Sequence, residues 1–458
     1  MEDTTRITIE EALSKQRSFF ATGQTVGLKF RLENLARLDS ALHQWEKRLA
    51  DALWEDLHKS YEEAFMTEFS MIYQEIRNHR KHLRNWSKPK RVPSPLHLLP
   101  STGKILRQPL GVSLIISPWN YPVQLLLNPL VGAISSGCCA MLKPSPYTAA
   151  VSGVLEEMIR ETFDPGYISI VQGDRIVNGI LLEQRFDLIF FTGSPALGRM
   201  VMQAAAKNLT PVVLELGGKS PVIVDAGANL DIAARRIAWG KTINAGQTCI
   251  APDYLLVHQS VKDELLKKMA ASFNRMFGPD IQQNKFFARI IRPQAVERLQ
   301  NLMKHGKIVY GGRVDPADRY IEPTLIDEID RDDPIMHEEI FGPILPVMSF
   351  SQLNEAISYI NAHEKPLALY YFGRTGQARE VLKRTASGGG CINDTLLHVA
   401  NHRMPFGGTG NSGMGKYHGH ESFLAFSHTR SILTSSTRID LLVKYPSYKG
   451  FKWIKKIL

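Results

Sequence analysis

The chain has 458 residues, of which 44% are hydrophobic and 22% are charged. One compact core seldom holds a chain of this length, so two or three domains are expected. The composition excludes a mainly disordered protein. The formal net charge is +10, but Lys and Arg are spread along the chain, which favours a solvated surface. Attraction to a membrane surface or an anionic ligand is the alternative, and no nucleic-acid partner is expected.

The cysteines and the N-terminus indicate a reduced compartment. Cys138, Cys139, Cys249 and Cys391 form neither a disulfide framework nor a zinc-type pattern, so no metal site is predicted and a cytoplasmic location is expected. The acidic N-terminus lacks the apolar segment of a secretory signal. No run approaches the roughly 18 apolar residues that a membrane-spanning helix needs.

The first quarter of the chain is predicted to be helical. The pattern is helical from Ile7 to about Trp86. One apolar stripe recurs at steps of three, four and seven residues: Phe65, Phe69, Ile72, Ile76 and Leu83. Four prolines and several basic residues interrupt this pattern between Lys88 and Pro100, which predicts a connector or arm. Thr102 to Gln108 is then expected to be extended.

A regular alternation of short apolar strands and helices begins at Gly111. Strands are predicted at 111–117, 139–143, 168–171, 187–192 and 212–216, with helices at 124–136, 149–163, 176–184 and 196–206. This alternation predicts a parallel sheet with helices on both faces, a Rossmann-like domain. Ligands of such sheets bind at the carboxyl ends of the strands, which would bring Asn120, Lys143 and Gly193 to one edge.

A second α/β series is predicted to follow. Its strands are expected near 254–257, 308–310, 344–347, 368–372 and 391–393, and its helices near 230–242, 261–277, 295–305, 353–361 and 378–385. Residues 402–420 read as an ordered loop and 422–433 as a strand. The predicted domains are a cofactor domain (1–86 and 108–216), a catalytic domain (217–400) and a bridging or oligomerisation arm with the tail (87–107 and 401–458).

A carboxylate and a thiol are candidates for the chemistry. Glu215 lies between Leu214 and Leu216 at the end of a predicted strand, where loss of solvation would raise its pKa toward the range of a general base. Cys249 lies in a loop of small residues after the next helix, and a thiol needs such a base to react near neutral pH. The alternatives are a buried inert thiol and a paired buried acid.

Two further features fit this chemistry. Asn120, in the loop after the first strand, could donate to the oxyanion that forms when a thiol attacks a carbonyl; a simple turn asparagine is the alternative. The segment from Gly193 through Ser194 to Gly198 starts a helix whose free N–H groups suit a pyrophosphate. This GxxxxG pattern is a weak motif when taken alone.

Taken together, the motifs resemble those of the aldehyde dehydrogenase superfamily, and most closely its shorter class 3 branch. The matching stretches occur in the family's order from about Gly111 to the end: ISPWNYP (116–122), LKPS (142–145), FTGS (191–194), LELGGKSP (214–221), GQTC (246–249), EEIFGP (338–343) and PFGG (405–408).

The resemblance implies a role for each candidate residue. Cys249 would attack an aldehyde, Asn120 and the Cys249 N–H would hold the oxyanion, and Glu215 would activate the water that hydrolyses the thioester. NAD or NADP would be bound by Trp119, Lys143, Gly193, Ser194, Gly198, Leu216, Gly217, Glu339 and Phe341. Tyr121, Trp239 and Thr248 would line the aldehyde tunnel.

The sequence departs from the family pattern at Pro146, where Glu commonly follows LKPS and binds the adenosine ribose. Its loss removes an acceptor for the 2′-hydroxyl and a repulsion against a 2′-phosphate, so use of either NAD or NADP is expected. Pro195, where Thr is frequent, starts a helix and should be tolerated.

The resemblance also bears on substrate and partners. The implied activity is oxidation of aldehydes, medium or long aliphatic, aromatic or apocarotenoid, to acids by a homodimer. An acylating or acyl-phosphate reductase of the same fold, a non-enzymatic protein that keeps the fold, and a cysteine hydrolase are the alternatives; the presence of both Glu215 and Cys249 counts against the first two. In the tail, Phe451, Ile454 and Leu458 share a helical face among lysines, which predicts either weak association with the inner membrane surface or docking onto the protein.

Overall fold

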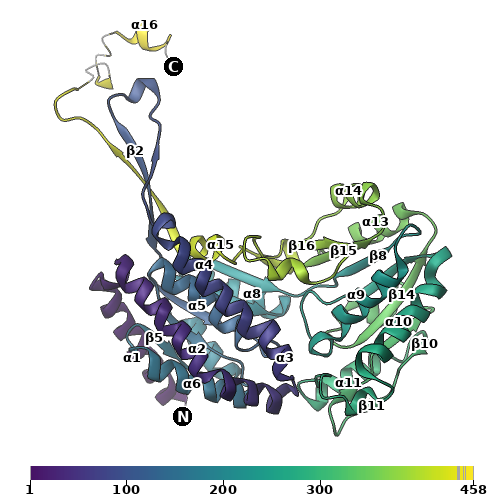
Figure 1. Cartoon of the computed structure of the whole chain (residues 1–458). Coiled ribbons are helices and arrows are strands. Elements are labelled where there is room, and N and C mark those ends of the chain that lie inside the picture. Colours follow the sequence, from purple (N-terminus) through teal and green to yellow (C-terminus); the bar gives the residue numbers. More distant parts are fainter. Residues whose placement is uncertain (1, 441–443, 447, 449, 457–458) are drawn as a thin grey trace.

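The computed structural model describes residues 2–440, 444–446, 448 and 450–456. Two lobes lie side by side, and a narrow arm projects away from the first of them (Figure 1). The first lobe contains the predicted parallel sheet, whose order is β17-β7-β6-β3-β4-β5. Its strands are β3 (Val112–Ile116), β4 (Cys139–Lys143), β5 (Ile168–Ile170), β6 (Leu188–Gly193), β7 (Val212–Leu216) and the antiparallel edge strand β17 (Gly413–Met414).

Helices cover this sheet, as the alternation predicted. They are α1 (Glu2–Ala21), α2 (Leu28–Leu57), α3 (Tyr61–Ala64), α4 (Ser70–Trp86), α5 (Gln124–Ser136), α6 (Ala149–Thr162), α7 (Arg175–Glu183) and α8 (Pro195–Ala206). The chain joins α3 to α4 through a π-helical segment, Phe65–Phe69. In β3 and β4 every side chain is buried, which explains why both strands read as unbroken apolar runs.

The second lobe is built on a seven-stranded sheet of order β10-β13-β14-β9-β8-β15-β16. Its strands are β8 (Pro221–Val224), β9 (Tyr254–His258), β10 (Lys307–Tyr310), β13 (Thr324–Asp327), β14 (Ile344–Phe350), β15 (Ala368–Phe372) and β16 (Gly389–Ile392). The helices are α9 (Leu230–Thr242), α10 (Lys262–Phe277), α11 (Pro293–Leu302), α12 (Pro334–His337), α13 (Leu353–Asn361) and α14 (Thr375–Arg384), beside a small hairpin of β11 (Val314–Asp315) and β12 (Tyr320–Ile321). Strands β8 and β13 are not among those predicted from the sequence.

The arm is a three-stranded antiparallel sheet of β1 (Lys90–Val92), β2 (Thr102–Pro109) and β18 (Ser427–Thr434). The prediction of one strand over 422–433 is wrong in its first half, because α15 (His420–Ala425) precedes β18 there. His418 and Gly419 both adopt positive φ and turn the chain into that helix. A last short helix, α16 (Phe451–Ile454), lies beyond the tip of the arm (Figure 1).

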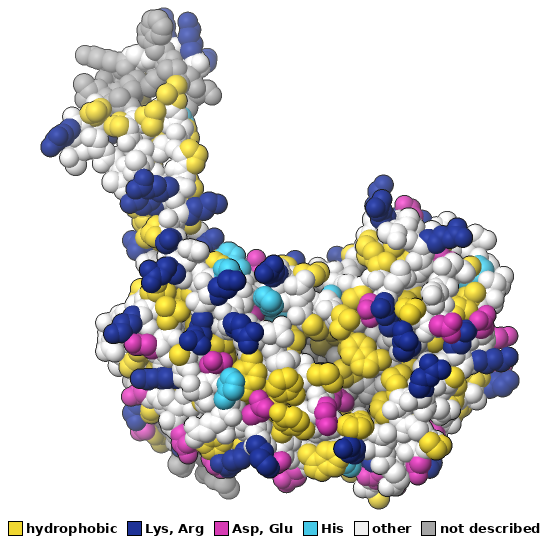
Figure 2. Space-filling view, in the orientation of Figure 1, with side chains coloured by type: hydrophobic (Ala, Val, Ile, Leu, Met, Phe, Trp, Pro, Cys, Tyr) yellow, Lys and Arg dark blue, Asp and Glu magenta, His cyan; other side chains and the backbone are white. Residues whose placement is uncertain are grey.

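The excess positive charge is concentrated in this arm and the tail. Residues 87–110 and 427–458 hold 12 of the 55 Lys and Arg but one of the 45 Asp and Glu, which leaves 43 basic and 44 acidic residues elsewhere. Lys and Arg do occur along the whole chain, but their excess over Asp and Glu comes from the arm and the tail. Figure 2 shows Lys and Arg side chains gathered at the base of the arm and a few farther along it. The three predicted domain ranges follow these bodies only approximately and stay a prediction.

Candidate active site

The parallel register brings the predicted loops to one edge of the first sheet. Ile116, at the end of β3, pairs with Lys143 of β4 on one side and with Phe191 of β6 on the other. The segments that follow these strands therefore leave the sheet together. Glu215 lies at the same edge, because it pairs with Thr192 across β6 and β7.

Cys249 is held in a tightly constrained loop after α9. Asn244, Ala245 and Gly246 all adopt left-handed backbone conformations, with φ of 50°, 51° and 74°. A Cβ at Gly246 would collide with the backbone of Gly342, so only glycine fits there. This requirement accounts for the first residue of the GQTC motif.

Gln247 anchors the same loop from inside the protein. Its side-chain amide donates to the carbonyls of Asn244 at 3.0 Å and Arg289 at 2.9 Å, and its Oε1 accepts from Ile291 N at 2.9 Å. The hydroxyls of Thr248 and Tyr121 are hydrogen-bonded at 2.6 Å. Cys249 thus has a fixed position, and its thiol is half-buried.

The thiol of Cys249 opens into an apolar cavity of about 270 Å³. The three predicted substrate residues, Tyr121, Trp239 and Thr248, line it. So do residues that the sequence analysis missed: Met66, Met71, Leu125, Ile243, Leu396, Leu397, Val399, Phe406 and Tyr417. Hydrophobic side chains also gather around the hollow between the two lobes in Figure 2.

Glu215 is 3% exposed, and neither carboxyl oxygen has a hydrogen-bond partner among the described residues. Burial alone raises its pKa well above the ordinary range. Burial also raises the pKa of the Cys249 thiol, and the nearby carboxyls of Glu339 and Glu215 add to this effect. Both groups are therefore protonated at rest, so the thiol needs a base in order to react.

Asn120 meets the loop of Cys249 directly. The side-chain amide of Asn120 donates to the backbone carbonyl of Gln247 at 3.0 Å. The backbone carbonyl of Asn120 accepts from the side-chain amide of Asn244 at 2.8 Å. One amide hydrogen of Asn120 is thus engaged with the loop, and an amide carries a second.

Glu339 and Phe341 approach the other side of the site. The carboxyl of Glu339 packs directly on Gly217, where a Cβ would occupy its place. Burial, with Asp253 nearby, raises the pKa of Glu339 to about 8. The ring of Phe341 meets that of Trp119 edge to face, with centroids 5.4 Å apart. Each of these residues was predicted to bind the cofactor. The fold brings them into contact as two pairs, Glu339 with Gly217 and Phe341 with Trp119.

The remaining predicted cofactor residues form an edge that suits a dinucleotide. Ser194 caps α8 by accepting from Leu197 N at 3.4 Å, and the first turn of that helix is partly open to solvent. Gly198 packs closely on Leu216, where a Cβ would clash. Lys143 is 1% exposed and donates to the Pro144 carbonyl at 2.8 Å, so two of its three ammonium hydrogens could bind hydroxyls; burial lowers its pKa to about 8.

A groove of about 290 Å³ passes Pro195, Gly217, Gly218 and Glu339 and so adjoins this edge. The residues present therefore fit a nicotinamide dinucleotide. In the part of the chain that the structure describes, no group of His, Cys, Asp and Glu could hold a metal ion. None of the described helices is long and apolar enough to cross a membrane.

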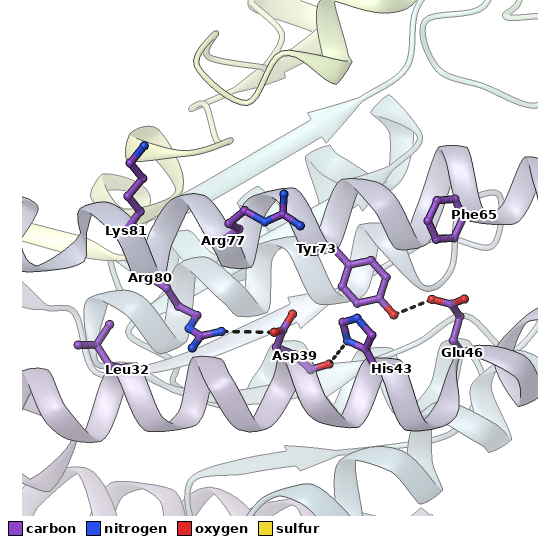
Figure 3. Close-up of a pocket in the computed structure, with 9 residues that line it drawn as sticks. All are labelled: Leu32, Asp39, His43, Glu46, Phe65, Tyr73, Arg77, Arg80 and Lys81. Carbon is purple, nitrogen blue, oxygen red and sulfur yellow. Dashed lines mark hydrogen bonds and ion pairs between the residues drawn. The ribbon is translucent and has the colours of Figure 1, made fainter.

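A larger hollow of about 990 Å³ lies between α2 and α4 (Figure 3) and does not fit a catalytic role. Its polar side chains bind one another: Tyr73 donates to Glu46 at 2.6 Å and Arg80 to Asp39 at 3.3 Å. Arg77 and Lys81 do not converge on a common point in Figure 3.

The comparisons with known proteins agree with this geometry. The model of the aldehyde dehydrogenase family matches residues 1–432, and the chain belongs to this family. It is 46% identical to the 4,4'-diaponeurosporen-aldehyde dehydrogenase of Staphylococcus aureus over 98% of each chain, and 43% identical to human aldehyde dehydrogenase family 3 member B1 over 95% of this chain and 94% of that one. It is 41% identical to the dimeric NADP-preferring aldehyde dehydrogenase of dog over 96% of this chain and 97% of that one.

The fold matches as closely as the sequence. A solved structure of the substrate-bound state of Staphylococcus aureus AldH superimposes with a TM-score of 0.96, at 46% identity, over 98% of this chain and 99% of that one. The predicted fold class and family are confirmed. The protein is an oxidoreductase whose activity is the NAD(P)-dependent oxidation of aldehydes.

Proposed function

We propose that this protein oxidises apolar aldehydes to carboxylic acids with Cys249 as the nucleophile. The observation that carries the proposal is the position of the Cys249 thiol, which opens into an apolar cavity and lies within electrostatic range of the buried carboxyl of Glu215. The cavity suits a hydrophobic tail on the aldehyde, and the thiol faces the space where the carbonyl would lie.

The first half of the reaction forms a thioester. The Cys249 thiol gives its proton to solvent water, and its sulfur bonds to the carbonyl carbon, which leaves the negative charge on the aldehyde oxygen. The free amide hydrogen of Asn120 and the backbone N–H of Cys249 donate to that oxygen. Glu339, Phe341 and Trp119 would hold the nicotinamide of NAD or NADP, which would supply the hydride acceptor for the same carbon. Restoration of the carbonyl then completes the thioester.

The second half of the reaction releases the acid. Glu215 removes a proton from water, the water oxygen bonds to the thioester carbon, and the C–S bond breaks to return Cys249 as a thiolate. Before this step Glu215 must lose its own proton, because burial keeps it protonated at rest. Glu339 and Phe341, with Trp119 and Gly217, would position the nicotinamide end of the cofactor.

The adenosine end of the cofactor would lie along α8. Lys143 would bind ribose hydroxyls, and Gly193 with Ser194 and Gly198 would border the pyrophosphate, beside Leu216. Pro146 is exposed and offers no carboxylate to a 2′-hydroxyl. The protein would therefore use either NAD or NADP.

We infer that the substrate is a medium- or long-chain, aromatic or apocarotenoid aldehyde. The apolar lining supports this class, as does the name of the Staphylococcus aureus relative. A panel of aldehydes of increasing length, each with NAD and with NADP, would test it: kcat/KM should rise with apolar length, and a preference for short polar aldehydes would contradict it. With coenzyme A present the product should still be the acid; a thioester would indicate an acylating enzyme instead.

A homodimer is supported by the arm, which projects from the first lobe with exposed Leu96, Leu99 and Leu433 (Figure 1). Such a flat, partly apolar ribbon favours pairing with a second copy. Sedimentation-equilibrium mass should be twice that of the chain, and a monomer mass would contradict this proposal.

We also propose that the protein is cytoplasmic and binds weakly to the inner surface of the membrane. All four cysteines are free, and the arm and tail combine excess basic residues with exposed Ile439, Tyr445 and Phe451. Ile454 belongs to α16, and Leu458 lies outside the described residues. Deleting residues 445–458 should reduce cosedimentation with anionic vesicles, and equal binding would contradict the proposal.

A further inference from the structure

A buried ion pair lies directly behind the loop of Asn120. Lys59 and Glu68 are both 0% exposed, and their charged groups lie 2.7 Å apart. Lys59 follows the end of α2, and Glu68 belongs to the π-helical segment before α4. The sequence analysis assigned neither residue a role.

Both members of the pair also bind the loop that carries Asn120. The Lys59 ammonium donates to the carbonyl of Asn120 at 3.1 Å and lies 4.3 Å above the ring of Tyr121. The second carboxyl oxygen of Glu68 accepts from the backbone N–H groups of Val123 at 2.8 Å and Gln124 at 3.2 Å. The pair therefore holds this loop at its middle and at its junction with α5.

The same helical segment reaches the loop of Cys249. Glu63 accepts from the backbone N–H of Asn244 at 2.7 Å, and the Asn244 amide donates to the Asn120 carbonyl that Lys59 also binds. Lys59 and Asn244 thus meet at the backbone oxygen of Asn120, and Glu63 holds Asn244 from the same part of the chain as Lys59.

Stability alone is a weak reason for a pair placed this deeply. Removing two charges from water costs several kcal/mol for each ion, and well-packed apolar residues are often as stabilising as a buried pair. A fixed pair of charges does, however, set the direction of the groups that it binds. Here those groups are the backbone carbonyl of Asn120 and the backbone N–H groups of Val123 and Gln124.

We propose that Lys59 and Glu68 are positioning residues that orient Asn120 toward the oxyanion of the reacting aldehyde. The inference rests on the proposed role of Asn120. Lys59 fixes the peptide after Asn120, and Glu68 fixes the start of α5. The side-chain amide of Asn120 is then aimed into the site by its bond to Gln247.

The variant Lys59→Met with Glu68→Met tests the proposal, because it replaces both charges with apolar side chains of similar size and leaves neither member of the pair without its partner. The rate of the first NADH burst should fall by about 10- to 100-fold, while KM for the aldehyde changes less than about threefold. Lys47→Met is the matched control, since Lys47 forms an exposed pair with Asp51 on α2 at 2.6 Å and should leave the burst unchanged.

The deciding measurement repeats the double substitution in an Asn120→Ala background. If the pair acts through the Asn120 amide, the added loss there should be below about threefold, because the group that it orients is already absent. A full additional loss in that background, or loss of the folded state in the double variant, would make the pair structural and overturn the proposal.

Failure of the two proposals can be told apart. A normal burst in Asn120→Ala itself would reject Asn120 as the oxyanion donor and with it the proposed function of that residue. A slow burst in Asn120→Ala together with a normal burst in the Lys59→Met, Glu68→Met variant would reject only the positioning role.

Discussion

The hydroxyl of Tyr121 lies 2.6 Å from that of Thr248, so a wall of the apolar cavity is hydrogen-bonded to the residue that precedes Cys249. Tyr121 belongs to the loop after β3 in the first lobe, and Thr248 follows α9 in the second. This bond couples the position of the nucleophile to the shape of the substrate cavity.

Tyr121→Phe keeps the ring and removes this bond. We expect kcat/KM for an apolar aldehyde to fall about 5- to 10-fold, since a buried hydrogen bond contributes about 1 kcal/mol and leaves the Thr248 hydroxyl unpaired when lost. Thr248→Val should cost a similar factor. The double variant should cost little more than either single one; multiplicative losses would show that the bond is not what couples the two residues.

Glu215→Gln separates the two halves of the reaction. The variant should keep a burst of NADH close to one equivalent per active site and then turn over about 100-fold more slowly than the wild type or worse, because no group activates the hydrolytic water. Rapid-mixing absorbance of the reduced cofactor measures both phases. Loss of the burst would mean that Glu215 is also the base for Cys249.

The raised pKa of Glu215 also predicts a pH-dependent cost in stability. In the folded protein burial keeps this carboxyl protonated, whereas in the unfolded chain it ionises near its ordinary pKa of about 4.3. Between these two values the folded state binds the extra proton, so the free energy of unfolding falls as pH rises, by up to about 1.4 kcal/mol per pH unit.

Glu215→Gln removes this contribution and leaves every other titrating group in place. The melting temperature of the variant should therefore exceed that of the wild type by a margin that grows from about pH 5 to about pH 8. Scanning calorimetry at a series of pH values measures the difference. A margin that stays constant or shrinks with pH would contradict a protonated Glu215.

Pro146 predicts weak discrimination between the two nicotinamide cofactors. The ratio of kcat/KM for NAD to that for NADP should be well below about 1,000 in the wild type. Pro146→Glu should raise it about tenfold or more, because the new carboxylate accepts from the 2′-hydroxyl and repels a 2′-phosphate. Pro146→Ala adds no charge and should leave the ratio near that of the wild type.

Local pattern was enough to predict the first sheet and most of the second. Strands such as Val112–Ile116 are buried on both faces, so they read as continuous apolar runs between helical segments. The loop of Cys249 could be located from its small residues and the GQTC motif, whereas the contacts that fix Gly246 and Gln247 come from distant parts of the chain. Pro221–Val224 was missed as a strand because it is short, starts with proline and lies only two residues after the Gly217–Gly218 pair.

The residues behind the site could not be predicted in this way. Lys59 and Glu68 look like surface charges in a helical segment, and only the fold shows that both are buried against Asn120. The apolar cavity could not be predicted for the same reason, because its lining residues Met66, Trp239 and Leu397 come from distant parts of the chain. Such contacts arise from tertiary packing, which periodicity does not encode.

The central claim is that Cys249 carries the chemistry, and replacing it by alanine tests the claim most directly. Cys391, the other half-buried thiol, contacts His398 at 3.6 Å and is the matched control. With a long-chain aldehyde and NAD, Cys249→Ala should form no NADH in either the burst or the steady state, whereas Cys391→Ala should react at nearly the wild-type rate. NADH formation by Cys249→Ala at more than a trace of the wild-type rate would contradict the account.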